Sequence, residues 1–256
     1  MARYPTWHAV RVWQRNFDVF RKHSLPTLLG PSVGEPLLYL LGLGYGLGTL
    51  VGQVGGIPYV EFVAPGMVVS SAMFAAAYEC TYQAHVRMVH QKTYEAILTT
   101  PLSLEDIVAG DVLWGTSKGV FNGSIVLVIA ALLGLVKSPW MFAVPLVLAL
   151  LAWLFAALSL AVAALARSFE FFNYYLTLFI TPMFLFCGVF FPLSALPPWM
   201  HAVAKALPVT LAVNAVRVLM QGHGGVGVMF PLLSLIPLAL GAFVVAVLAV
   251  RHRLIH

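Results

Sequence analysis

The chain has 256 residues, of which 61% are hydrophobic and only 9% are charged. These proportions exclude a soluble globule, which is about 25% charged, and a disordered chain, which is poor in apolar residues. With only two cysteines, the chain is not a disulfide scaffold. The net charge is +5, from 14 Lys+Arg and 9 Asp+Glu, and these residues lie between long apolar runs rather than in the single basic cluster of a nucleic-acid binder.

The N-terminal residues 4–22 predict an amphipathic helix lying along a membrane surface, within a cytoplasmic interface segment 1–24. The helical wheel gives one apolar face and one basic face. The apolar face holds Trp7, Val10, Trp13, Phe17 and Phe20, and the basic face holds Arg11, Arg15 and Lys22. A simple anchor and a mechanical role both remain open for this helix.

Six apolar runs are long enough to cross a hydrocarbon core of about 30 Å. They are Leu25–Leu50, Phe62–Ala84, Ile107–Val136, Trp140–Ala166, Phe171–Phe191 and Met229–Val250. Because the runs are continuous rather than alternating, they favour helices over a closed barrel. We therefore expect an all-α integral membrane protein with one domain over 1–256, six spans in 25–250 and a tail at 251–256.

The loop charges give this arrangement an orientation. With the N-terminus in the cytoplasm, ten Lys and Arg fall on the inner side and three on the outer side. The inner ones are Arg3, Arg11, Arg15, Arg21, Lys22, Arg87, Lys92, Arg167, Arg251 and Arg253, and the outer ones are Lys137, Lys205 and Arg217. Both termini are therefore expected in the cytoplasm.

Two segments between the spans are too structured for simple loops. The inner segment Arg87–Ser103 has a helical middle that ends before Pro101, and Ser103-x-x-Asp106 has the spacing of a capping box for the next span. The outer segment Pro192–Val228 is apolar and divided by prolines, which favours a re-entrant or interface-lying helical hairpin followed by a turn at Gly222–Gly227.

Charged side chains within the spans are the most informative chemical feature, because charges are costly in lipid. They are Glu35, Glu79, Asp111 and Lys118. Asp111 and Lys118 are seven residues apart and share nearly one helical face. They could form structural ion pairs between spans, or they could line a polar cavity, where an ion-coupled secondary transporter would use them.

The fifth run carries nine aromatic residues in 21. An aromatic belt at the membrane surface explains those near its ends, but not Phe179 or Phe184. A wall contacting acyl chains and sugar rings would use such side chains, and core packing is the alternative. We take Tyr174, Tyr175, Phe179 and Phe184, with Glu35 and Lys118, as candidates for a translocation path.

Catalytic and metal motifs are missing from the sequence. The string from Gly110 to Lys118 is not a Walker A motif, because its lysine follows Ser117 and lies in an apolar run. There is no HExxH motif, and Cys80 and Cys187 are expected to be buried thiols. A membrane protease or transferase is therefore disfavoured, and we expect no metal site and no enzymatic activity in this chain.

Taken together, the motifs resemble the type-2 ABC exporter permeases, most of all the nodulation-protein J type. The resemblance is carried by Phe62–Met67, Tyr94–Ser103, Gly188–Pro197, Leu207-Pro208 and Asn214–Arg217. It implies a bacterial inner-membrane exporter of a lipo-oligosaccharide or a similar amphipathic saccharide. Efflux of drugs or lipids is the alternative within the same family.

The resemblance also implies a division of labour between chains. Two copies of the permease pair, and each docks one separate ATPase subunit that binds the ATP and Mg, so no cofactor is expected here. A cytoplasmic coupling helix would contact the ATPase through Gln91, Lys92, Tyr94, Glu95, Thr100 and Pro101. An outer gate would contain Phe191, Pro192, Leu196, Pro197 and Arg217.

Overall fold

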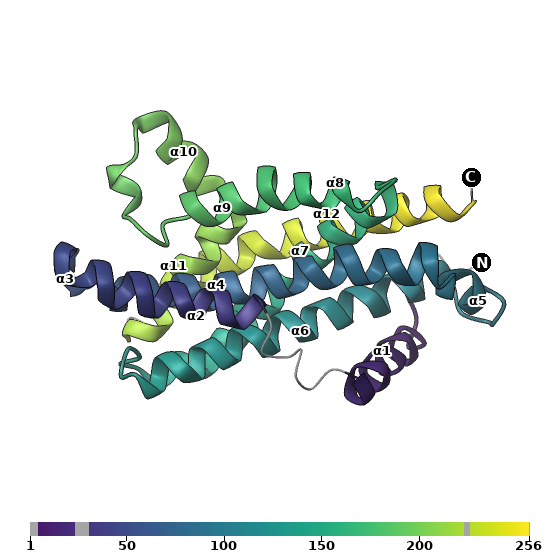
Figure 1. Ribbon diagram of the computed structural model, residues 1–256, viewed down its shortest axis with the longest axis horizontal. Helices are drawn as coiled ribbons and strands as arrows, with labels where there is room; N and C mark the ends of the chain where they lie inside the picture. The colour runs from purple at the N-terminus through teal and green to yellow at the C-terminus, as the bar shows by residue number, and fades with distance from the viewer. Residues whose placement is uncertain (1–4, 24–30, 223–225, 256) are drawn as a thin grey trace.

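The computed structural model describes residues 5–23, 31–222 and 226–255, and these form a bundle of roughly parallel long helices (Figure 1). The short helix α5 (Thr93–Leu98) and the C-terminal end of the last helix lie at one end of the bundle, and α3 and α10 lie at the other. We refer to them as the α5 end and the α10 end. The start of the first expected span, before residue 31, and residues 223–225 of the expected outer turn lie outside the described residues.

The long helices differ in how regular they are. α6 (Leu104–Leu132), α7 (Val144–Leu165) and α12 (Val226–Ile255) are α-helical throughout. α4 (Tyr59–Tyr78) continues as one helix to His90 through the π-helical turns η3 (Glu79–Gln83) and η4 (Val86–His90). Inserted π turns are frequent at functional sites, and η3 and η4 carry two of the charges described below.

Two further helical stretches are interrupted by π turns. The first comprises α2 (Pro31–Leu41), η2 (Gly42–Leu47) and α3 (Gly48–Val51). The second comprises α8 (Glu170–Tyr175), η6 (Leu176–Ile180) and α9 (Thr181–Phe186). The shorter elements are α1 (Ala9–His23), the antiparallel strands β1 (Gln53–Val54) and β2 (Ile57–Pro58), α5 (Thr93–Leu98), η5 (Pro139–Ala143), η7 (Leu193–Ala195), α10 (Pro198–Ala206) and α11 (Pro208–Gln221).

Among the described residues, four helices are long and apolar enough to cross a membrane. They are Tyr59–His90, Leu104–Leu132, Pro139–Leu165 and Gly227–Leu254, and they coincide with four of the six expected spans. α10 and α11, bent by 78° at their junction, form a fifth if the pair is one broken span. The first and fifth expected spans correspond to the π-interrupted stretches 31–51 and 170–186, whose crossing of the membrane stays a prediction.

Local sequence signals account for several of the observed boundaries. Ser103 and Asp106 form the expected capping box: the Ser103 Oγ accepts from the Asp106 backbone N–H, and the Ser103 N–H donates to Asp106 Oδ2 at 3.1 Å. Prolines begin α10 and α11, where a missing backbone N–H costs nothing. The expected division of the outer segment into short helices is therefore confirmed.

The core lies where α4, α6 and α7 meet, and α4 is at its centre because 89% of its most apolar stretch is buried. Gly115, Gly119 and Gly123 make this packing possible. A Cβ atom on Gly119 would lie 2.6 Å from the Ala152 Cβ atom of α7 and 2.8 Å from the Ala72 carbonyl oxygen of α4. Such close backbone approach is typical of helix contacts in membranes. Gly115, which belongs to the rejected Walker A string, therefore serves helix packing, as Gly119 and Gly123 do.

We expect Gly119→Leu to destabilise the protein by at least about 3 kcal/mol, because neither Ala152 nor the Ala72 backbone can yield enough space. Gly241→Leu on α12 is the control, since a Cβ atom there meets nothing within 4 Å. Thermal unfolding of the two purified variants measures the difference. Equal melting temperatures would show that the α4–α6–α7 contact is not close-packed.

Part of the expected apolar face of α1 packs against α6, since Trp13, Phe17 and Phe20 contact the Trp114 ring, but the most buried residues of α1 lie beside that face. Trp7 precedes the helix and is 89% exposed, and Phe17 is 40% exposed. Ala9, Val12 and Asn16 are buried instead. The reason is that α1 crosses α6 at Gly110, where a Cβ atom would lie only 2.5 Å from the Val12 Cβ atom.

Candidate functional site

The segment expected to contact an ATPase forms the short helix α5, which projects at the α5 end of the bundle (Figure 1). Five of the six candidate side chains are exposed on it or beside it: Gln91, Lys92, Glu95, Thr100 and Pro101. The sixth, Tyr94, is only 1% exposed and faces the bundle. Tyr94 therefore anchors α5, and Glu95 is an exposed acidic group on it.

Beneath α5 lies a set of polar side chains that we call the buried charge network. Its members come from α1, from the end of the α4 helix, from α5 and from α6. They are Asn16, Glu79, Arg87, Tyr94, Asp111, Trp114 and Lys118. Two carboxylates face two cations, so the network is formally neutral, as buried charges require.

Glu79 links α4 to α6 through three donors. Its Oε1 atom accepts from Arg87 Nη1 at 2.8 Å and from Trp114 Nε1 at 2.9 Å. Its Oε2 atom accepts from Lys118 Nζ at 2.7 Å. The Glu79 side chain is 4% exposed, so these charge-assisted bonds replace the water it would otherwise bind.

Asp111 joins four elements at one carboxylate. Asn16 of α1 donates to Oδ1 at 2.5 Å, and the hydroxyl of Tyr94 of α5 donates to Oδ2. Arg87, at the end of the α4 helix, places Nη2 3.4 Å from the same Oδ2 atom. Asp111 itself is on α6 and is 1% exposed. Asp111 therefore connects α1 and α5 to the adjacent ends of two long helices.

The protonation state of Tyr94 suits this arrangement. Burial, and next the negative charge of Asp111, hold the pKa of the Tyr94 phenol well above its ordinary value. The hydroxyl therefore keeps its proton and remains a donor to Asp111.

Lys118 extends the network to the aromatic residues of α1. Its Nζ atom lies 4.7 Å from the ring centroid of Phe20 and 5.6 Å from that of Trp114. Trp13 adds a hydrogen bond from Nε1 to Ser117 Oγ at 2.9 Å. A cation–π contact and a hydrogen bond therefore both attach α1 to α6.

Asp111 and Lys118 do not pair with each other among the described contacts, although they share one face of α6. Each forms its ion pair with α4 instead, Asp111 with Arg87 and Lys118 with Glu79. Of the two readings of these charges, the structure shows the one with ion pairs between spans.

The candidates for a translocation path fall into separate groups: Tyr175 and Phe179 stack with ring centroids 5.6 Å apart, and Tyr39 links Glu35 to Phe184. Lys118 belongs to the buried charge network on α6, whereas the aromatic candidates lie on 170–186. Tyr174 and Phe179 are 63% and 44% exposed, and the Tyr175 hydroxyl lies 3.1 Å from Ser159 Oγ. Phe184 is 5% exposed, which places it in the packing of the chain rather than on an accessible wall. Glu35 is half-buried on α2.

The outer-gate candidates surround the turn after α9. Arg217 of α11 donates from Nη2 to the carbonyl oxygens of Gly188 at 2.9 Å and of Phe62 at 3.3 Å, and lies over the Phe62 ring at 4.3 Å. Phe191, Pro192 and Leu196 are half-buried and Pro197 is exposed. Arg217 therefore fastens α11 to this turn and to α4.

Sequence reasoning missed three members of the buried charge network. Asn16, Arg87 and Trp114 were not among the candidate site residues, and Glu79 was noted only as a charge within a span. The available signal was the high cost of isolated charges in lipid. Glu79, Asp111 and Lys118 together need one more positive charge, and Arg87 lies close by at the end of a span.

Comparison with known proteins places these features in a family. The model of the ABC-2 type transporter family matches residues 10–220. "Nodulation protein J" of Sinorhizobium fredii is 38% identical over 250 residues, covering 97% of this chain and 95% of that protein. "Nodulation protein J" of Rhizobium leguminosarum bv. trifolii is 43% identical over 217 residues, covering 84% and 81%. "Inner membrane transport permease YadH" of Escherichia coli is 27% identical, covering 82% of each chain. This chain belongs to the ABC-2 type transporter family and is a multi-pass membrane protein related to the Nodulation protein J proteins.

Proposed function

We propose that this chain is the membrane subunit of an ATP-driven exporter in the bacterial inner membrane, with both termini in the cytoplasm. A separate ATPase subunit docks at α5, and two copies of the chain form the complex with two ATPases. ATP and Mg²⁺ bind to the ATPase, so this chain contributes binding and movement rather than bond chemistry.

The observation that carries this proposal is the attachment of α5 to the buried charge network. Tyr94 connects an exposed helix to Asp111, and Asp111 connects it through Arg87 to the end of α4. Ion pairs of this kind have discrete arrangements, because an unpaired buried charge is costly. Closure of the ATPases would therefore move α5, α1 and the spans together.

The proposed substrate is a lipo-oligosaccharide or a similar amphipathic saccharide, moved outward. The relationship to the Nodulation protein J proteins supports this class, although their name states no substrate. The exposed rings of Tyr174 and Phe179 support contact with an apolar or sugar-bearing ligand. The turn fastened by Arg217 would form part of the outer exit.

An ion-coupled transporter is less well supported by the geometry. Asp111 and Lys118 would be its ion site, but both side chains already have opposite charges as partners. The neutral buried charge network leaves neither group free to exchange an ion without breaking an ion pair.

Purification of the tagged chain from its native membrane tests the proposal. We expect a separate ATPase subunit to be recovered with it in about equal amounts, as judged by mass spectrometry and quantitative gel staining. A stable chain recovered without any ATPase would contradict the proposal.

Charge reversal on α5 is the sharper test. Glu95→Arg is expected to lower recovery of the ATPase at least about tenfold, because it places a cation where α5 offers an exposed carboxylate. Glu170→Arg at the start of α8 is the matched control, since it reverses another exposed carboxylate outside α5. Unchanged assembly and export in Glu95→Arg would rule out α5 as the docking helix.

A further inference from the structure

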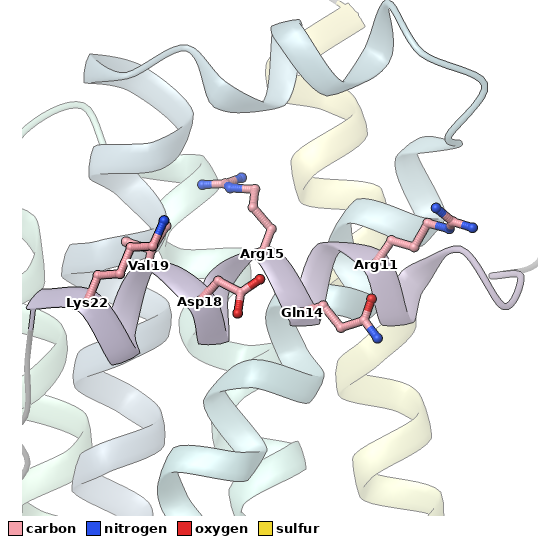
Figure 2. A pocket seen from close by; sticks show the side chains of 6 residues that line it. All are labelled: Arg11, Gln14, Arg15, Asp18, Val19 and Lys22. Carbon is pink, nitrogen blue, oxygen red and sulfur yellow. The ribbon is translucent and has the colours of Figure 1, made fainter.

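A shallow groove of about 570 Å³ runs along α1, on the side opposite the face that packs against α6. It is lined by Arg11, Gln14, Arg15, Asp18, Val19 and Lys22. Figure 2 shows the three cationic side chains projecting to the same side of the helix axis. The groove thus presents three cations and one carboxylate, a net charge that favours an anionic ligand.

The depth of α1 indicates where that ligand comes from. α6 has 29 residues, about 43 Å at 1.5 Å per residue, whereas the hydrocarbon core takes about 30 Å. About 20 residues counted back from Leu132 place the start of the hydrocarbon core near Val112. α1 contacts α6 at Gly110, Asp111 and Ser117. These contacts lie on both sides of Val112, so α1 lies at the boundary between the lipid headgroups and the hydrocarbon core.

We propose that the groove on α1 binds the phosphate headgroup of an anionic phospholipid at the α5 end of the membrane. Arg11 and Lys22 are exposed, so both can contact a headgroup. Arg15 is half-buried between the groove and the buried charge network, and its pKa is lowered by burial, with the charges of Asp111 and Arg87 acting on it in opposite directions. A bound headgroup would therefore act on the network through Arg15.

A lipid fits this surface better than an acidic protein segment does. The groove lies on α1 at the membrane boundary, and apolar side chains flank it: Val19 is 52% exposed and Phe17 is 40% exposed. Cations beside exposed apolar residues on one helix are the pattern of interfacial lipid binding. The site requires only that the helices cross a membrane, so it does not depend on an ATPase partner.

Native mass spectrometry of the purified full chain in detergent tests the site, with phosphatidylglycerol and phosphatidylcholine as probes. The variant R11Q/K22Q is expected to bind phosphatidylglycerol about 25-fold more weakly, at about fivefold for each cation. Binding of phosphatidylcholine is expected to be unchanged. The control R21Q/R167Q removes the same charge from exposed positions outside the groove and is expected to bind like the parent.

Asp18→Asn is expected to change the affinity for phosphatidylglycerol in the opposite direction. Removing the carboxylate from the groove is expected to strengthen phosphatidylglycerol binding about fivefold, which a loss of folding cannot mimic. The proposal is overturned if both double variants bind the lipid equally, or if inorganic phosphate binds as tightly as phosphatidylglycerol. It is also overturned if R11Q/K22Q loses a co-purifying ATPase while keeping the lipid, because the groove would then be a protein contact.

Discussion

Glu79→Ala is expected to destabilise the protein by about 3–5 kcal/mol, the largest loss from any single charge deletion at this site. The substitution leaves Lys118 without its ion partner and the indole N–H of Trp114 without its acceptor. Arg87 keeps only the longer contact with Asp111, at 3.4 Å. The free energy of unfolding in mixed micelles, measured against increasing SDS, checks the loss.

Two controls separate burial from charge. Lys137 and Glu61 form an ion pair at 2.7 Å, but the Lys137 side chain is 54% exposed, so Glu61→Ala is expected to cost at most about 1 kcal/mol. The double variant Glu79→Leu with Lys118→Leu removes a charge of each sign and is expected to recover much of the loss. Equal costs for Glu79→Ala and Glu61→Ala would mean that water reaches the buried charge network, as it would in a cavity.

The spans and caps could be predicted because their causes are local. A long apolar run is sufficient to indicate a helix in lipid even where it carries one or two charges, and four such runs are helices in the structure. The Ser103 cap depends only on residues three apart, and it forms as expected. The first run contains Glu35, and in the structure π turns interrupt both the first and the fifth runs. For these two runs, composition alone predicted spans that are not among the long apolar helices of the described residues.

The buried charge network could not be predicted, because its contacts join residues far apart in the sequence. Asn16 and Asp111 are 95 positions apart, and Glu79 and Lys118 are 39 apart. Asn16 is polar and belongs to neither the apolar nor the basic face of the α1 helical wheel. It is nevertheless buried, because Asp111 accepts its side-chain N–H. The spacing of Asp111 and Lys118 showed only that they share one face of a helix, and it could not identify their partners, which lie on the turns η3 and η4 that follow α4.

The second large effect is expected for Tyr94→Phe, which removes one hydroxyl and keeps the ring. Asp111 retains Asn16 and Arg87, so the fold is expected to survive. α5 loses its hydrogen bond to the spans, at a cost of about 1–3 kcal/mol. Since 1.4 kcal/mol is a factor of about ten in an equilibrium, the proposed coupling implies at least about a fivefold loss of transport per ATP hydrolysed.

Reconstituted vesicles containing the permease and its ATPase measure this ratio directly. Tyr45→Phe removes the same hydroxyl from a side chain that is 46% exposed and has no proposed role, and we expect it to behave like the parent. If both variants keep the parent ratio of transport to hydrolysis, then Tyr94 is only a packing residue and the network does not couple α5 to the spans.

The pH dependence of stability gives an independent check on the same hydroxyl. Because the folded-state pKa of Tyr94 is raised, the native protein holds this proton where the unfolded chain, with a phenol pKa of about 10, releases it. Its contribution is therefore complete below about pH 10 and declines as the pH rises further. Between about pH 9 and 11 the melting temperature of the parent should fall more steeply than that of Tyr94→Phe. Parallel curves would show that the phenol is not held protonated against Asp111, and the link from α5 to the spans would lose its physical basis.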